Sequence, residues 1–252
     1  SESPERSQPL WVCNADGSGR EQMTSLMPPT DPAVTDWISY PTDDAHSWPV
    51  VSPDGEWVVF TESRSFRPRV KESKLVRVRT DGTGRRTLTP PDQIANRPVF
   101  THDGNWVIYT SYDESGVPTA MKVSIHGGVP VRMPFDRECA TNDIDRTGSM
   151  MICCDRESNE YLVSLEGGLL WEGDLPARHP IRFTPDNLMS YVDPRDGNVW
   201  AEAVDGSPRR QLTSFDSLRV LDHAWHPTEN RLVVSRGGWF YEAVIVSNLP
   251  EF

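Results

Sequence analysis

Short runs of apolar and aromatic residues recur along the chain, and each begins just after a tight-turn sequence. The clearest are Ser-Pro-Asp-Gly at residues 52–55 before the run 57–60, and Thr-His-Asp-Gly at residues 101–104 before the run 106–109. In such turns a proline presets φ, the aspartate bonds its own backbone and the glycine closes the turn. The runs are rich in strand-forming residues and too short for helices. Each copy therefore predicts a β-hairpin.

Weaker copies of this turn follow at residues 145–148, 184–187 and 226–230. Counted at the fourth position, the five copies are 49, 44, 39 and 42 residues apart, at residues 55, 104, 148, 187 and 229. A second hairpin signal, Asp-Gly or Gly-Gly between alternating strands, occurs at residues 16–17, 81–82, 127–128, 167–168 and 205–206. Two hairpins make four strands, which is the size of one propeller blade.

These repeats predict an all-β protein with a single β-propeller domain of about six four-stranded blades. The expected blades are residues 1–44, 45–92, 93–137, 138–174, 175–215 and 216–252. The first shows only the second hairpin, and the last lacks a fourth strand. An N-terminal strand could complete the last blade and cover its exposed edge. A further blade upstream of residue 1 is the competing explanation.

The repeat pattern resembles the TolB-like, or PD40, family of propeller repeats over nearly the whole chain. Residues 175–186 and 210–248 are most similar to the C-terminal sensor propellers fused to bacterial serine/threonine kinases and winged-helix regulators. That resemblance implies sensing or protein–protein contact without chemistry of its own, and the chain has no His-Arg-Asp or Asp-Phe-Gly kinase signature. Three turns depart from the family pattern: Arg146-Thr147 replaces Pro-Asp, Asn187 replaces Gly, and Thr228-Glu229 replaces Asp-Gly. The sequence therefore does not determine the geometry of these three turns.

The net charge and the length of the apolar runs argue against nucleic acid and the membrane interior as binding partners. The chain has 25 basic and 37 acidic residues, a formal charge of −12, so most of its surface repels nucleic acid. No apolar run reaches the ~18 residues of a membrane span, and we expect no direct membrane insertion. The N-terminus lacks signal-peptide order and begins with Ser rather than Met. We expect a monomeric domain of a longer chain, periplasmic or otherwise extracytoplasmic in a kinase-type sensor and cytoplasmic otherwise.

The cysteines predict neither a metal site nor a disulfide framework. Four are too few for a disulfide scaffold in a chain of this size, and none belongs to a Cys-x-x-Cys pair. We therefore expect buried thiols on strands at Cys13, Cys139, Cys153 and Cys154.

The strand before each turn is expected to be the innermost of its blade and to begin at the mouth of the central channel. Ligand sites combine a concave surface with a few convergent polar groups, and arginines there could hold a carboxylate or phosphate. The candidate residues at these strand starts are His46, Asn96, Arg97, Asn142, Arg178, His179, Asp222 and His223. The alternative is that polar channel mouths face water and cap strand ends. A loop of the last blade adds Trp239 and Tyr241, which either anchor a partner or pack inward.

Two functional classes follow from these residues. The first is a non-catalytic propeller that binds a protein partner or small ligand at the channel mouth, without a cofactor, as a sensor or interaction domain of a larger signalling protein. The second is a metal-dependent propeller lyase or hydrolase in which His46, His179 and His223 share a divalent cation in the channel. The second class requires ligand atoms within ~2.0–2.2 Å of one ion.

Overall fold

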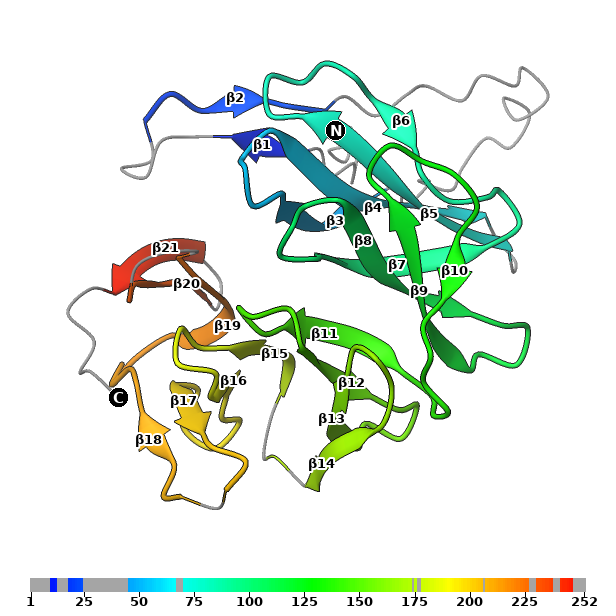
Figure 1. Ribbon diagram of the computed structural model, residues 1–252. Coiled ribbons are helices and arrows are strands. Elements are labelled where there is room, and N and C mark those ends of the chain that lie inside the picture. The colour runs from blue at the N-terminus through cyan, green and yellow to red at the C-terminus, as the bar shows by residue number, and fades with distance from the viewer. Residues whose placement is uncertain are drawn as a thin grey trace. The chain divides into compact units, whose positions relative to one another are not determined.

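The computed structural model describes residues 10–12, 18–24, 45–66, 70–173, 175, 178–205, 207–226, 230–237 and 241–246. Over these residues the secondary structure consists of β-strands and turns, and the strands form six sheets (Figure 1). The all-β class is therefore confirmed. Within the same residues, no helix has the length and apolar character of a membrane span.

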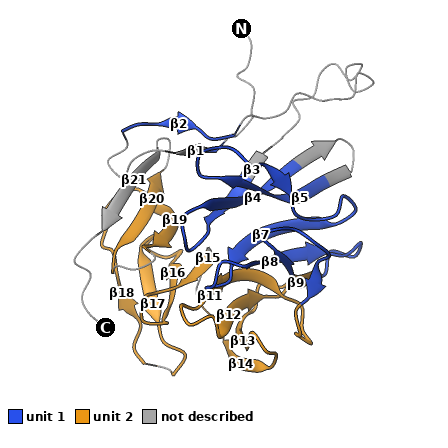
Figure 2. Ribbon diagram, turned by 45° about the horizontal axis from the view of Figure 1, so that its top comes forward, with its two compact units in different colours: residues 1–117, 121–132 blue, residues 118–120, 133–252 orange. Residues whose placement is uncertain are grey.

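Two compact units divide the chain and are coloured separately in Figure 2. Unit 1 comprises residues 1–117 and 121–132, and unit 2 comprises residues 118–120 and 133–252. In the first half of the chain the strands are β1 (Trp11–Val12), β2 (Glu21–Gln22), β3 (Ala45–Val51), β4 (Trp57–Phe66), β5 (Val70–Arg79), β6 (Arg86–Thr87), β7 (Ile94–Phe100), β8 (Trp106–Tyr112), β9 (Pro118–Ser124) and β10 (Val131–Arg132). Strand β9 begins in unit 2 and continues in unit 1.

The remaining strands all lie in unit 2. They are β11 (Ala140–Ile144), β12 (Met150–Cys154), β13 (Glu160–Ser164), β14 (Leu169–Gly173), β15 (Arg178–Phe183), β16 (Met189–Val192), β17 (Val199–Glu202), β18 (Arg210–Gln211), β19 (Arg219–Trp225), β20 (Leu232–Gly237) and β21 (Tyr241–Val246).

Four sheets have the four strands of a complete blade, with neighbours in sequence order: β3–β6, β7–β10, β11–β14 and β15–β18. Sheet β19–β21 has three strands, and sheet β1–β2 has two. The described residues thus form four complete blades, fewer than the prediction of about six. Both incomplete sheets fall in repeats whose sequence lacks a full set of hairpin signals. The two blades that are not complete are therefore the first and last repeats, where the sequence pattern is weakest.

The predicted tight turns are present before β4 and β8. The amide of Gly55 donates to the Ser52 carbonyl at 2.9 Å, and Gly55 and Gly104 have φ of 75° and 69°. Asn187 occupies the same position before β16 with φ of 62°, a left-handed conformation that asparagine adopts more readily than most side chains. The turn before β16 therefore forms although Asn187 replaces the glycine of the repeat pattern. The turn at residues 228–229 lies outside the described residues.

The turn that carries Arg146-Thr147 is held by one carboxylate. The Asp145 side chain accepts hydrogen bonds from the backbone amides of Thr147, Ser149 and Met150 at 3.1, 2.8 and 2.6 Å. Gly148 has φ of 70°, as the glycines of the other turns do. The missing Pro-Asp is therefore compensated, because a side chain satisfies the backbone donors of the turn.

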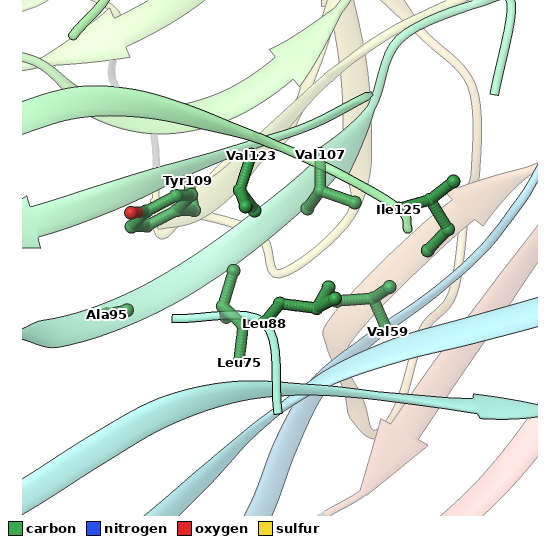
Figure 3. Close-up of a cluster of buried hydrophobic side chains, with 8 residues drawn as sticks. All are labelled: Val59, Leu75, Leu88, Ala95, Val107, Tyr109, Val123 and Ile125. Carbon is green, nitrogen blue, oxygen red and sulfur yellow. The ribbon is translucent and has the colours of Figure 1, made fainter. Parts of the chain in front are cut away.

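The hydrophobic core of each unit lies between successive sheets. In unit 1, side chains of sheets β3–β6 and β7–β10 meet in the cluster shown in Figure 3, formed by Val59, Leu75, Leu88, Ala95, Val107, Tyr109, Val123 and Ile125. In unit 2, one cluster joins sheet β11–β14 to sheet β15–β18 and another joins β15–β18 to β19–β21. This face-to-face packing buries both faces of a sheet, as expected for propeller blades.

One prediction about the cysteines is wrong. Cys139 and Cys153 form a disulfide, with their Cα atoms 5.1 Å apart, whereas Cys154 is a buried thiol on β12 outside this disulfide, as expected. The hairpin of β11 and β12 returns the chain antiparallel, so residues 14 positions apart become neighbours. Sequence spacing could not reveal that proximity. Cys13 lies outside the described residues.

Candidate functional site

The candidate residues of the channel mouth lie on the first strands of five sheets, β3, β7, β11, β15 and β19, where the register of pairing shifts. Such a shift marks a β-bulge, which bends a strand and re-aims its side chains. These shifts were not predicted from the sequence, although Pro49, Pro98 and Pro180 lie in three of the strands and proline inside a strand indicates a bulge. The shifts fall between Ser47 and Val50, Asn96 and Val99, Thr141 and Asp143, Arg178 and Arg182, and Val220 and Asp222.

Several candidate residues are placed only by their backbone. His46 lies in β3 opposite Glu62, Arg178 and His179 lie in β15, and Tyr241 lies in β21. Their side chains, and the whole of Trp239, lie outside the described residues. The predicted contributions of these five residues to a site therefore stay predictions.

In unit 1 the site residues are Asn96 and Arg97 of β7. The side-chain Oδ1 of Asn96 is buried and has no hydrogen-bond partner among the described residues. Arg97 has φ of 50° and Trp48 of β3 has φ of 53°, a conformation that costs a non-glycine residue roughly 1–3 kcal/mol. The Arg97 guanidinium lies 5.2 Å from the centroid of the Trp48 ring, so a cation–π contact joins the two strained positions.

In unit 2, Asn142 and Asp143 follow each other on β11. Asn142 is 7% exposed, and its Nδ2 has no partner among the described residues. The carboxylate of Asp143 accepts the backbone amide of Phe183 on β15 at 2.8 Å, which ties the first strands of two sheets together. Burial raises the pKa of Asp143, and the charge of Arg182 opposes that rise. Asp143 was not among the predicted site residues, although it directly follows Asn142, which was.

His223 of β19 is 2% exposed and lies in a closed hydrogen-bond network. Its Nε2 is 3.0 Å from Ser190 Oγ, which also accepts the Trp225 indole N–H at 2.8 Å and donates to the Arg182 carbonyl at 3.0 Å. Because the single hydroxyl proton goes to that carbonyl, Nε2 must donate its own proton. The Nδ1 atom is then an acceptor, and it has no partner among the described residues.

Electrostatics keep this histidine neutral. Burial, and then the nearby Arg182 charge, lower the pKa of His223 to about 3. Arg182 Nε donates to the His223 carbonyl at 2.7 Å, and its Nη2 lies 3.6 Å from the carboxylate of the exposed Asp222. The residues of β15 and β19 therefore hold a neutral, preorganised acceptor beside an ion pair. Sequence gave no signal for Ser190, because it lies on the second strand of its sheet.

This network does not form a nucleophilic triad. Ser190 is fully buried, while a catalytic serine must reach its substrate and its histidine must be oriented by a third group at the other nitrogen. Nothing among the described residues occupies Nδ1 of His223. For the metal hypothesis, no group of three His, Cys, Asp or Glu side chains in the described part of the chain is placed to hold an ion.

Comparison with known proteins identifies the fold. No family profile matches the sequence. Over 94 residues, 35% of this chain, it is 29% identical to Tricorn protease homolog 1 of Streptomyces coelicolor, and it spans 9% of that protein. Solved structures match more widely: TolB from Agrobacterium tumefaciens has a TM-score of 0.63 at 18% identity over 79% of this chain and 72% of that one.

Two further structures agree. TolB from Acinetobacter baumannii has a TM-score of 0.53 at 20% identity, covering 80% of this chain and 47% of that one. The β-propeller domain of the Trilobed protease from Pyrococcus furiosus has a TM-score of 0.52 at 12% identity, covering 81% and 68%. At these identities the likeness concerns the fold alone. Together with the repeated four-stranded sheets, it shows that the chain is an all-β protein with a TolB-like β-propeller fold.

Proposed function

We propose that this chain is a non-catalytic propeller that binds a protein partner or small ligand at the mouth of its channel. One observation carries the proposal: the candidate residues Asn96, Asn142 and His223 each hold a buried polar atom that has no partner among the described residues. A buried donor or acceptor left unpaired costs roughly 1–3 kcal/mol. In either unit, a bound molecule that supplies a missing partner recovers that free energy, and ordered water is the competing occupant.

We further propose that the domain belongs to a larger signalling protein. Similarity to the propellers of bacterial kinases supports this context, and so does a chain that spans 9% of a curated relative. The Cys139–Cys153 disulfide favours an extracytoplasmic position, because disulfides persist in oxidising compartments. Sheets β1–β2 and β19–β21 are then the incomplete first and last of about six blades.

Site-specific photo-crosslinking tests the binding proposal. A photo-reactive amino acid is placed at Asp222, which is exposed in the middle of β19 beside the buried His223, and in a matched protein at Val131, which is exposed on the outer strand β10. The proteins are irradiated in cells of the source organism, and native mass spectrometry of the purified protein detects small ligands. We expect an adduct from position 222 and none from position 131. Equal labelling at both positions, or no adduct and no bound mass, refutes the proposal.

A further inference from the structure

A pocket of about 370 Å³ in unit 2 opens beside sheet β11–β14, and it contains none of the candidate channel residues. Two short segments and one strand residue line it. Asp136, Arg137 and Glu138 precede β11, while Asp155, Arg156 and Glu157 form the turn between β12 and β13, and Tyr161 lies on β13. A volume of this size is at the lower end of small-molecule sites.

Two of the lining residues have polar atoms that find no hydrogen-bond partner in the described part of the chain. Tyr161 is 2% exposed, and its hydroxyl has no hydrogen-bond partner among the described residues. Burial raises the pKa of this phenol, so the hydroxyl keeps its proton. Arg137 uses Nη2 on the carboxylate of Glu172, at 3.1 and 3.3 Å, while its Nη1 is buried and unpartnered. The two residues touch, because the guanidinium lies 5.1 Å from the Tyr161 ring centroid.

The unpaired atoms call for an anionic or carbonyl oxygen. Guanidinium nitrogens are donors only, and a protonated phenol donates as well. A carboxylate can accept from both at once, with charge-assisted hydrogen bonds on the arginine side. Loss of the Tyr161 hydroxyl alone therefore removes one of two donors and leaves the aromatic packing in place.

The other lining residues are mainly acidic, so they favour a positively charged group on the ligand. Four carboxylates stand against two guanidiniums, and one of the guanidiniums, Arg156, is engaged with Glu138 at 2.8 Å. The Asp155 carboxylate is occupied by the backbone amide and side chain of Asn159. Asp136 and Glu157 remain as exposed carboxylates at the rim, where an ammonium group is favoured.

We propose that this pocket binds a small zwitterion of the α-amino acid class. Its carboxylate pairs with Arg137 and Tyr161, and its ammonium group lies against the acidic rim formed by Asp136 and Glu157. The disulfide supports the site, because Cys139 directly follows one lining segment and Cys153 is the register partner of Tyr161. The covalent link therefore holds the two walls of the pocket in place before a ligand arrives.

Calorimetric titration of the purified protein with the standard amino acids tests the ligand class. The panel includes, for each binder, the N-acetylated form and the carboxamide form. We expect at least one free amino acid to bind and each blocked form to bind about tenfold or more weakly. Absence of any binding amino acid overturns the proposal. Undiminished binding of the N-acetylated form also overturns it, since that result indicates a carboxylate site such as one for a peptide C-terminus.

Two tyrosine variants separate binding from folding. Tyr161→Phe removes a hydroxyl for which the described residues supply no partner, so the stability of the free protein should hold or rise while amino-acid affinity falls about tenfold. Tyr191→Phe is the matched control, because the buried Tyr191 donates to Glu202 at 3.0 Å on the neighbouring sheet. It should lower the melting temperature and leave affinity unchanged. Equal affinity of Tyr161→Phe and the wild type refutes the site, whatever crosslinking at the channel mouth shows.

Discussion

The buried histidine of β19 predicts a specific loss of stability in mild acid. The pKa of His223 is about 3 in the folded protein and has an ordinary value of 6.5. Below pH 6.5 the unfolded chain binds a proton at this residue and the folded chain does not. Stability therefore falls with decreasing pH from 6.5 to about 3, because the unfolded state holds more protons throughout that window.

The size of the effect follows from the shift. Each pH unit inside the window costs about 1.36 kcal/mol, so lowering the pH from 7 to 5 removes about 2 kcal/mol of unfolding free energy. This figure at pH 5 is insensitive to the exact folded pKa, provided that the pKa stays well below 5. The raised pKa of Asp143 has the opposite sign, because protonation of that carboxyl favours the folded state. The histidine contribution must therefore be isolated as a difference between variants.

Urea denaturation of the wild type and His223→Gln at pH 7, 6 and 5 isolates this contribution. Glutamine can still donate from its Nε2 to Ser190 but does not titrate. We expect the stability difference between the two proteins to shift against the wild type by about 2 kcal/mol between pH 7 and pH 5. His102→Gln, at an exposed turn position, is the control for replacing a histidine by glutamine outside the buried network. A constant difference for His223→Gln would show that the folded and unfolded states bind protons equally at this residue, as a solvated imidazole does, and would refute the reasoning.

Three further predictions concern single contacts. Ser190→Ala leaves the buried histidine and Trp225 without their common acceptor, and chemical denaturation should show a loss of about 2–4 kcal/mol; a loss below about 0.5 kcal/mol would contradict the network. Asn187→Gly removes a side chain from a left-handed backbone position at φ 62°, together with a buried Oδ1 that has no partner among the described residues. The melting temperature should therefore rise by a few degrees, and a fall would show that the asparagine is not strained at this position. The double variant Cys139→Ser with Cys153→Ser should lose about 2–4 kcal/mol in an oxidising buffer, and the two proteins should become equal after reduction if the disulfide is the cause.

The repeat pattern predicted the sheets well because local chemistry determines them. The turns at Gly55 and Gly104 require a left-handed residue, and glycine after Asp marks that requirement in the sequence. The apolar runs that follow become the buried second strands β4 and β8. The number of complete blades was harder to predict, because a blade is complete only if distant segments pair, and pairing at the chain ends has no local signal.

The candidate site was predictable only in part, for a different physical reason. Position on the first strand pointed to Asn142 and His223, since strand order follows from the repeat. The partners that decide the chemistry of His223 come from other strands: Ser190 from β16 and Arg182 from β15. Whether a histidine side chain is a charged donor or a neutral acceptor depends on those contacts across sheets. A sequence motif cannot encode them at fixed spacing.

Tyr161 shows most clearly why the pocket could not be found from sequence. In the sequence it is an ordinary strand aromatic, and a strand tyrosine usually finds a partner for its hydroxyl when buried. Only the structure shows that this hydroxyl has no partner among the described residues and that Arg137, 24 positions earlier, lies over its ring. An unsatisfied group is a property of the whole fold, because it depends on every neighbour that could have supplied a partner. Unpaired buried atoms are therefore the most direct evidence in this protein for where a second molecule binds.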